Sequence, residues 1–117
     1  MDKTGIIKND NYSIQFLEKE HRIIFRGTMR LKDHEYRKTI NTDLISLSSR
    51  LEGFIELDVS QLEYLNSCGI ASLSVYLTQM KEFDTSIRIV GSNSISWQVM
   101  SLDNFPLCHD RVEIIMQ

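Results

Sequence analysis

The sequence has little proline, glycine and cysteine, and each shortage excludes a class of protein. One proline and five glycines exclude a collagen-like chain or a flexible linker. The two cysteines, Cys68 and Cys108, form neither a CxxC motif nor a disulfide framework, so we expect two reduced thiols and no metal site. No apolar run approaches the roughly 18 residues of a membrane helix, and the N-terminus lacks the apolar stretch of a signal peptide. We therefore expect a cytoplasmic protein that does not associate with membranes.

The residues that are present are typical of a small globular protein. The chain is 42% apolar and 25% charged, and its 117 residues suffice for one hydrophobic core. The 13 basic and 16 acidic side chains give a net charge of −3, which argues against binding to nucleic acid. The sequence contains no glycine-rich phosphate loop and no hydrolase or zinc-protease motif, so we expect no cofactor. We expect a single domain over residues 1–117, with residues 1–10 loose.

Alternation of apolar and polar residues predicts the strands. The alternation over 12–16 and again over 21–29 indicates a β-hairpin. Gly27 marks a bulge or a close backbone approach in the second of these strands. A short polar link is expected at 60–63, directly after a third strand. Three later strands are expected in all, at 54–59, 86–90 and 112–116.

Apolar residues spaced three and four positions apart predict helices between these strands. Asp33 is the expected N-cap of the first helix and Ser94 that of the last. The resulting order, β-β-α-β-α-β-α-β, indicates an α/β fold with a single mixed β-sheet and helices mainly on one face. The expected helices cover about 33–51, 67–81 and 94–102.

One segment of the sequence carries most of the functional information. An apolar strand ends in Asp58, and after a link the run Asn66-Ser67-Cys68-Gly69-Ile70 opens a helix. This order and spacing resembles the STAS domain of bacterial anti-sigma-factor antagonists, in which the strand ends in Asp and Asp-Ser-Ser-Gly-Ile follows. The resemblance covers residues 12–116. Asn66 replaces the Asp of that pattern and Cys68 its second serine, which matches a stand-alone STAS-like subgroup that also carries a Trp-Gln pair, here Trp97-Gln98.

The resemblance implies a non-enzymatic regulatory module that acts by protein–protein interaction in a partner-switching pathway. In the antagonist branch a kinase phosphorylates the first serine of the motif, which is Ser67 here. The implied partners are a serine kinase of the histidine-kinase-like ATPase type and an opposing metal-dependent serine phosphatase. A helix N-terminus accommodates an anion, so a phosphate would add about −1.5 to −2 charge without melting the helix and would release the bound partner. The alternative is that Ser67 serves only as a helix cap.

The other candidate residues each have a functional and a structural interpretation. Asp58 stands where ligands often bind in α/β folds, or it is a turn residue. Asn66 caps a helix as well as Asp does, but it brings no charge to the serine. Cys68 is a redox-sensitive thiol or an inert one, and Gly69 permits close packing or close approach of a partner. Trp97 is an exposed anchor for a partner or a core residue. The candidate partner- or ligand-binding residues are thus Asp58, Asn66, Ser67, Cys68, Gly69 and Trp97.

Two alternatives belong to other functional classes. One is a ligand-sensing STAS-like domain that has lost the phosphorylation switch and binds a small apolar molecule or a nucleotide near the Asn66–Ser67 helix opening. An apolar pocket beneath that helix would favour it. The other is an enzyme with Ser67 or Cys68 as its nucleophile. Such an enzyme requires a base, for example His109, within hydrogen-bond reach of that nucleophile.

Overall fold

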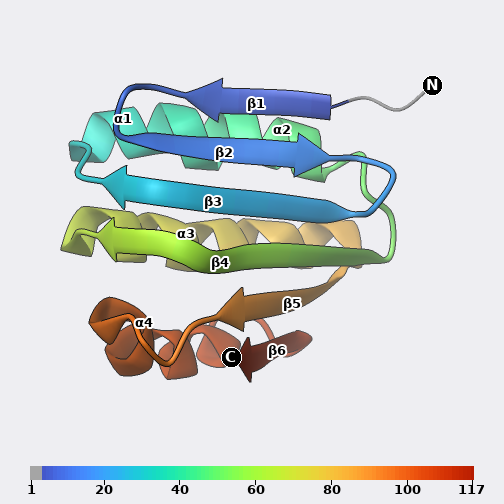
Figure 1. Ribbon diagram of the computed structural model, residues 1–117. Coiled ribbons are helices and arrows are strands. Elements are labelled where there is room, and N and C mark those ends of the chain that lie inside the picture. Colours follow the sequence, from blue (N-terminus) through green and yellow to red (C-terminus); the bar gives the residue numbers. More distant parts are fainter. Residues whose placement is uncertain (1–3) are drawn as a thin grey trace.

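Six strands form one mixed sheet in the computed structural model, which describes residues 4–117 (Figure 1). The strands lie side by side in the order in which the chain makes them. The first three pair antiparallel, and β3 to β6 pair parallel. The strands are β1 (Thr4–Lys8), β2 (Tyr12–Leu17), β3 (Arg22–Met29), β4 (Phe54–Leu65), β5 (Ser86–Gly91) and β6 (Val112–Met116).

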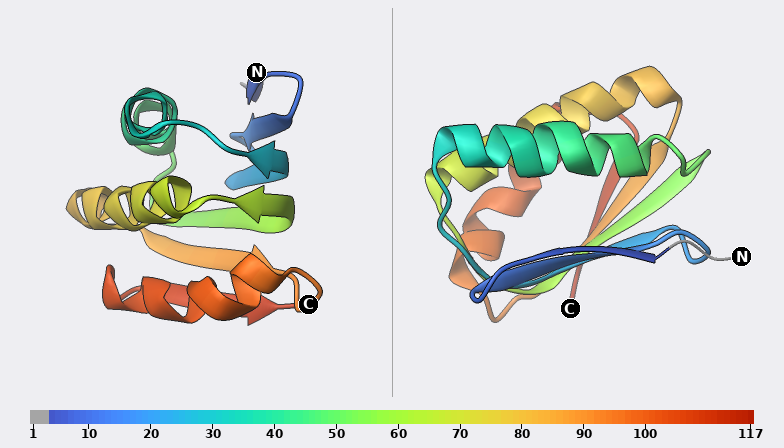
Figure 2. Two further views of the ribbon diagram at one scale, coloured as in Figure 1. Left: turned by 90° about the vertical axis from the view of Figure 1, so that its left-hand side faces the viewer. Right: turned by 90° about the horizontal axis from the view of Figure 1, so that it is seen from above.

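The helices cover one face of this sheet (Figure 2). This arrangement confirms the expected fold class, a single mixed sheet with helices mainly on one face. The first three helical segments, over residues 33–48, form one continuous helix, in which a π-helical turn joins two α-helical parts. The helical segments are α1 (Asp33–Lys38), η1 (Thr39–Leu44), α2 (Ile45–Ser48), α3 (Ser67–Met80), η2 (Lys81–Phe83), α4 (Ser96–Ser101) and η3 (Leu102–Leu107).

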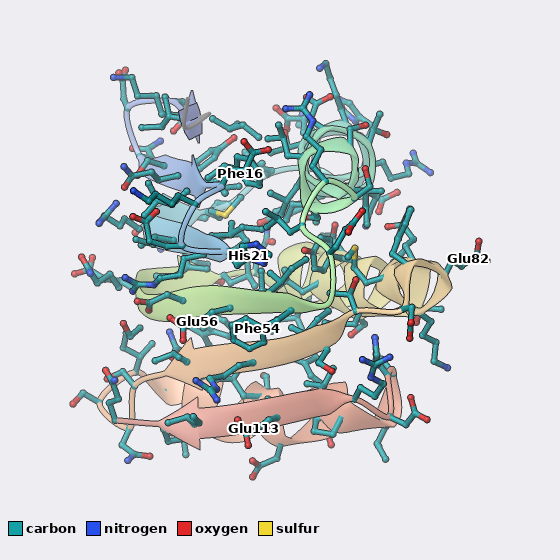
Figure 3. All side chains as sticks on the ribbon, turned by 90° about the vertical axis from the view of Figure 1, so that its right-hand side faces the viewer. Phe16, His21, Phe54, Glu56, Glu82 and Glu113 are labelled. Atoms are coloured by element: carbon teal, nitrogen blue, oxygen red, sulfur yellow. The ribbon has the colours of Figure 1, made fainter. Side chains whose placement is uncertain are left out.

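The hydrophobic core lies between the sheet and the helices. Phe16 points from β2 toward the helices, whereas Glu82, in η2 directly after α3, points away from the sheet (Figure 3). Tyr36 of α1 and Tyr76 of α3 are fully buried. The buried hydroxyl of Tyr76 lies 2.7 Å from the Ser48 hydroxyl, so this polar group is satisfied by the neighbouring helix.

The N-terminal segment corrects one expectation. Residues 4–8 are not loose but form β1, which pairs with β2 from Thr4↔Leu17 to Lys8↔Ser13. Ile7 lies opposite the buried Ile14 and packs against the core. Backbone pairing along an existing strand thus orders a segment that has little apolar side chain of its own. The expectation for residues 1–3 falls outside the described residues.

β4 is longer than the sequence suggested, because the expected polar link at 60–63 continues the strand. The register with β3 shifts between Ile24 and Arg26 and again between Gly27 and Thr28, so β4 accommodates extra residues in bulges. Each bulge changes the side-chain alternation by one position. The buried apolar residues of β4 are accordingly Ile55, Leu57, Val59, Leu62 and Leu65.

The expected helix caps are also corrected. Lys32, not Asp33, is the N-cap of α1, and the Glu35 side chain accepts a hydrogen bond from its backbone N–H at 2.9 Å. Ile95, not Ser94, is the N-cap of α4. The Ser94 N–H instead donates to the Ser92 hydroxyl at 3.1 Å, which keeps Ser94 in the preceding turn. The continuous first helix ends at Ser48, before the residue to which its apolar stripe extended.

Candidate functional site

The candidate site lies at the edge of the sheet where β3 and β4 end and where α1 and α3 begin (Figure 1). The Asn66 side chain lies at the centre of the hydrogen bonds at this edge. Its Oδ1 accepts a hydrogen bond from the Gly69 N–H at 3.0 Å, which makes Asn66 the N-cap of α3. Its Nδ2 donates to the Leu31 carbonyl at 3.1 Å. An aspartate would make the first contact and not the second, because a carboxylate has no N–H to donate.

Tyr36 completes the network around Asn66. Its hydroxyl lies 2.7 Å from Oδ1 of Asn66 and 3.1 Å from the Met29 carbonyl, and it accepts from the Leu31 N–H at 3.3 Å. Burial raises the pKa of Tyr36 to about 12, so the hydroxyl keeps its proton and remains a donor at neutral pH. The start of α1, the end of β3 and the cap of α3 therefore form one hydrogen-bonded unit.

Ser67 is the first residue of α3, and its side chain is exposed. Within residues 4–117 its hydroxyl makes no hydrogen bond, and the capping role belongs to Asn66. Cys68 is a free, exposed thiol beside it. The first turn of α3 contains no acidic side chain. The serine hydroxyl is thus accessible at a rigid helix start, where the unpaired backbone N–H groups favour a negative charge.

Gly69 permits close packing inside the protein. A Cβ at this position would meet the Leu65 side chain and would lie 2.7 Å from the Tyr36 hydroxyl. The first turn of α3 therefore rests directly on β4 and α1, which leaves no space for an apolar ligand beneath it. This packing does not supply the apolar pocket that would favour a ligand-sensing domain.

Asp58 lies in the middle of β4 and not at its end, because the strand continues to Leu65. Its carboxylate pairs with Arg22 at 3.0 Å and accepts from the Ser60 N–H at 3.0 Å and the Ser60 hydroxyl at 2.6 Å. These bonds satisfy the carboxylate within the sheet, so Asp58 is a paired strand residue and not the turn residue of the structural interpretation. Asp58 lies seven residues before the end of the strand that leads to Ser67, so the structure does not bring the two together.

Trp97 is 9% exposed, and its indole N–H donates to the Leu62 carbonyl at 2.8 Å. The neighbouring Gln98 is fully buried and donates to the carbonyls of Val59 at 2.6 Å and Leu62 at 3.1 Å. Strand β5 pairs with β4 only as far as Val90↔Asp58. The Trp-Gln pair thus occupies the position of a strand neighbour and satisfies carbonyls at the bulges of β4. This geometry favours the core interpretation of Trp97.

The structure does not bring His109 to Ser67 or Cys68. His109 precedes β6, beside the start of β5, whereas Ser67 follows the end of β4. The His109 ring is buried, and its Nδ1 accepts from the Arg111 N–H at 3.0 Å. Among residues 4–117 no group of three or more metal-ligating side chains comes together. Over the same residues no helix is both long and apolar enough to cross a membrane.

Comparison with solved structures identifies proteins with the same fold. SiaC of Pseudomonas aeruginosa superimposes with a TM-score of 0.70 at 16% identity, covering 98% of each chain. Its apo crystal structure gives 0.69 at 15% identity, covering 100% of this chain and 98% of that one. A chain in the crystal structure of the diguanylate cyclase SiaD in complex with its activator SiaC gives 0.69 at 18% identity, covering 97% and 99%.

These likenesses establish the fold over the whole described chain. No family model matches the sequence. No curated protein matches it either. The comparisons therefore show the fold alone, and what the chain does is argued below from its own residues.

The network around Asn66 contains residues that the sequence did not point to. Tyr36 carries the apolar stripe of its helix, so its pattern indicates a core residue and not a hydrogen-bond donor to the cap of another helix. Arg30 lies over the ring of Tyr64, 4.5 Å from its centroid, at the same edge. Arg30 directly follows β3, and Tyr64 lies near the end of β4. The ends of adjacent parallel strands meet at one edge of a sheet, and this was the signal in the sequence that could have placed the two side chains together.

Proposed function

We propose that this chain is a non-enzymatic regulatory module of the anti-sigma-factor-antagonist type, which binds a partner protein and releases it when Ser67 is phosphorylated. The proposal rests on the different roles of two adjacent residues at the start of α3. Asn66 caps the helix, and the adjacent Ser67 hydroxyl is exposed and makes no hydrogen bond within the described chain. A kinase can reach this hydroxyl without breaking any bond that the fold uses.

The chemistry of the position suits a switch that changes the surface and not the fold. A phosphoryl group on Ser67 would lie at the helix N-terminus, where the helix dipole stabilises negative charge. No carboxylate in the first turn of α3 repels it. At a protein–protein interface the same charge is costly to desolvate, so a bound partner would dissociate. The proposed enzymes are a serine kinase of the histidine-kinase-like ATPase type and a metal-dependent serine phosphatase, both acting in the cytoplasm.

The known partner of a structural neighbour suggests a second kind of target. SiaC is described as the activator of a diguanylate cyclase, with which it forms a complex. SiaC thus supports an enzyme as one kind of partner, whereas an anti-sigma factor as target rests on the motif resemblance alone. The target proposed for this chain is a protein of either kind.

Phosphate transfer tests the proposal directly. Incubation with the cognate kinase and ATP should add one phosphate, which peptide mapping places on Ser67, and Ser67→Ala should remain unmodified. Ser74→Ala is the matched control, since Ser74 lies on the same helix with its hydroxyl bonded to the Ile70 carbonyl at 3.2 Å. Partner binding should persist in Ser67→Ala and be lost in the phosphorylated protein. A phosphate on another serine, or none with an active kinase, contradicts the proposal.

A further inference from the structure

A hollow of about 370 Å³ opens at the edge of the sheet beside the Asn66 network. One of its lining residues, Leu31, belongs to both features, because its carbonyl accepts a hydrogen bond from Nδ2 of Asn66 at 3.1 Å. The hollow and the start of α3 are therefore neighbours. The lining residues are Asn9, Asn11, Tyr12, Thr28, Arg30 and Leu31.

One wall of the hollow keeps its position because residue 27 is a glycine. The Thr28 N–H donates to the Asn11 carbonyl at 2.8 Å, which brings the turn between β1 and β2 close to β3. At Gly27 the backbone adopts a φ of +94°, and a Cβ there would lie 3.0 Å from the Tyr12 Cα and closer still to the Asn11 carbonyl oxygen. A side chain at Gly27 would push the turn away from the strand, so the hollow is a built feature of the fold.

The hollow presents hydrogen-bond donors and no negative charge. Oδ1 of Asn9 is occupied by the backbone N–H groups of Asn11 at 2.8 Å and Tyr12 at 3.0 Å, which leaves its amide N–H groups for other partners. Within residues 4–117 the hydroxyls of Tyr12 and Thr28 make no side-chain hydrogen bond. None of the lining residues is acidic.

Arg30 supplies the charge of the hollow. Its guanidinium is held over the Tyr64 ring, 4.5 Å from the centroid, and no carboxylate pairs with it in the described part of the chain. By contrast, Arg22 and Arg88 on the sheet each pair with Glu56. An arginine that is positioned by an aromatic ring but lacks an anion is able to bind one with its planar fork of N–H donors.

We infer that this hollow binds a phosphoryl dianion, with Arg30 as the charged ligand and Asn9, Tyr12 and Thr28 as hydrogen-bond donors. Two sources present the same chemistry. One is the phosphoryl group on Ser67 itself, and this source rests on the proposed function. The other is the phosphate of a separate molecule, which does not. In the first case the hollow would hold the switch in its phosphorylated conformation, and in the second it would make the module responsive to a phosphorylated small molecule.

Titration of the unmodified protein with inorganic phosphate tests the second source. At constant ionic strength, phosphate should shift the NMR signals of the Arg30 Nε–H and of the Asn9 and Asn11 amide groups. Arg30→Gln should weaken this binding at least ~tenfold, since a charge-assisted hydrogen bond of this kind is lost. Arg50→Gln is the matched control, because Arg50 is an exposed arginine beyond the end of α2, and it should bind phosphate as the wild type does. Unfolding curves would verify that both variants remain folded.

Installing phosphoserine at position 67 during protein synthesis tests the first source. Arg30 should hold the second pKa of that phosphoserine, followed by phosphorus NMR, below its usual value of about 6, and Arg30→Gln should restore that value. Added phosphate should then leave the hollow's signals unchanged. A response in either titration that Arg30→Gln removes supports the site and identifies the source. No response in both, or a response that persists in Arg30→Gln, overturns it.

Failure of this inference is separable from failure of the proposed function. The phosphoserine is introduced without any kinase, so the absence of a kinase for Ser67 would contradict the proposed function and leave both titrations unaffected. Conversely, phosphorylation of Ser67 with partner release would stand even if neither titration depended on Arg30.

Discussion

The hydroxyl of Tyr36 lies 2.7 Å from Oδ1 of Asn66, and this hydrogen bond joins α1 to the N-cap of α3. The same hydroxyl is 3.1 Å from the Met29 carbonyl at the end of β3. One proton thus serves two acceptors, and the shorter distance is to the amide of Asn66. The elements around Ser67 are consequently held relative to one another by side chains that leave the serine itself unengaged.

Replacing Asn66 with Asp should destabilise the protein, even though the STAS pattern that the motif resembles carries Asp there. The variant keeps the acceptor for Gly69 but loses the donor to the Leu31 carbonyl and places a carboxylate against it. Because Asn66 is half-buried, we expect a loss of about 1 kcal/mol in the free energy of unfolding, measured by urea denaturation. A stability equal to or above that of the wild type would show that the amide donor contributes nothing.

Ser67→Ala should leave the free energy of unfolding within ~0.5 kcal/mol of the wild type, because the Ser67 side chain makes no bond in the described fold. Asn66→Ala is the matched comparison and should cost about 1 kcal/mol or more, since it removes the cap of α3. Both are measured by chemical denaturation. A larger loss for Ser67→Ala than for Asn66→Ala would return the capping role to the serine.

Gly69→Ala should destabilise the protein, although alanine is the better helix former by up to ~1 kcal/mol. The added methyl would contact Leu65 and the Tyr36 hydroxyl, so a net loss of about 1–3 kcal/mol is expected. Ala71→Gly, at an exposed position of the same helix, should lose about 1 kcal/mol through propensity alone. Thermal and urea unfolding of the two variants would separate these effects, and a stabilised Gly69→Ala would refute the close packing.

Trp97→Ala should cost about 3–5 kcal/mol of folding free energy, as expected for a buried aromatic residue. The Leu62 carbonyl would also lose its indole donor. Val99→Ala, which truncates a half-exposed residue of the same short helix, is the control and should change stability little. If Trp97→Ala instead weakened partner binding and left the unfolding curve in place, the residue would be an anchor for the partner.

Alkaline pH should destabilise the fold through Tyr36. Burial raises its pKa to about 12 in the native state, against 10.0 for an ordinary tyrosine. Below pH 10 both states keep the proton and the stabilisation is complete. Between pH 10 and 12 the unfolded chain loses the proton while the native state retains it, so the free energy of unfolding falls as pH rises.

Tyr36→Phe isolates this contribution. The variant should be less stable at neutral pH, because the Met29 carbonyl and the Asn66 cap lose a donor. It should also show a shallower loss of stability between pH 10 and 12. Burial raises the pKa of Tyr76 as well, so a residual slope is expected in the variant. Equal slopes in the two proteins would show that Tyr36 titrates normally.

The order of strands and helices followed from the sequence because its two periodicities are clear in the core. Residues 33–51 and 67–81 carry apolar stripes that only a helix can bury on one side, and the alternation at 12–16 suits only a strand. β1 was missed because its stability comes from the backbone of β2, which no local pattern reveals.

The details of the site were less accessible from the sequence. The largely polar residues at 60–63 look like a link in the sequence, but bulges keep them in β4. In the sequence, the bulges are visible only as a wider spacing of the apolar residues after Val59. The motif indicated Asn66 and Ser67 but not which of them caps the helix. That choice depends on Leu31 and Tyr36, which are distant in sequence and act through tertiary contacts.

Because the strands lie in the sheet in the order of the chain, each strand from β2 onward pairs with the one made just before it. From β2 onward, each strand finds a partner that has already been synthesised. As the chain leaves the ribosome from its N-terminus, each new strand meets an edge that already exists, and most closures span a single hairpin or one crossover helix. We therefore expect rapid folding for a parallel-rich sheet, with β6 completing the structure last.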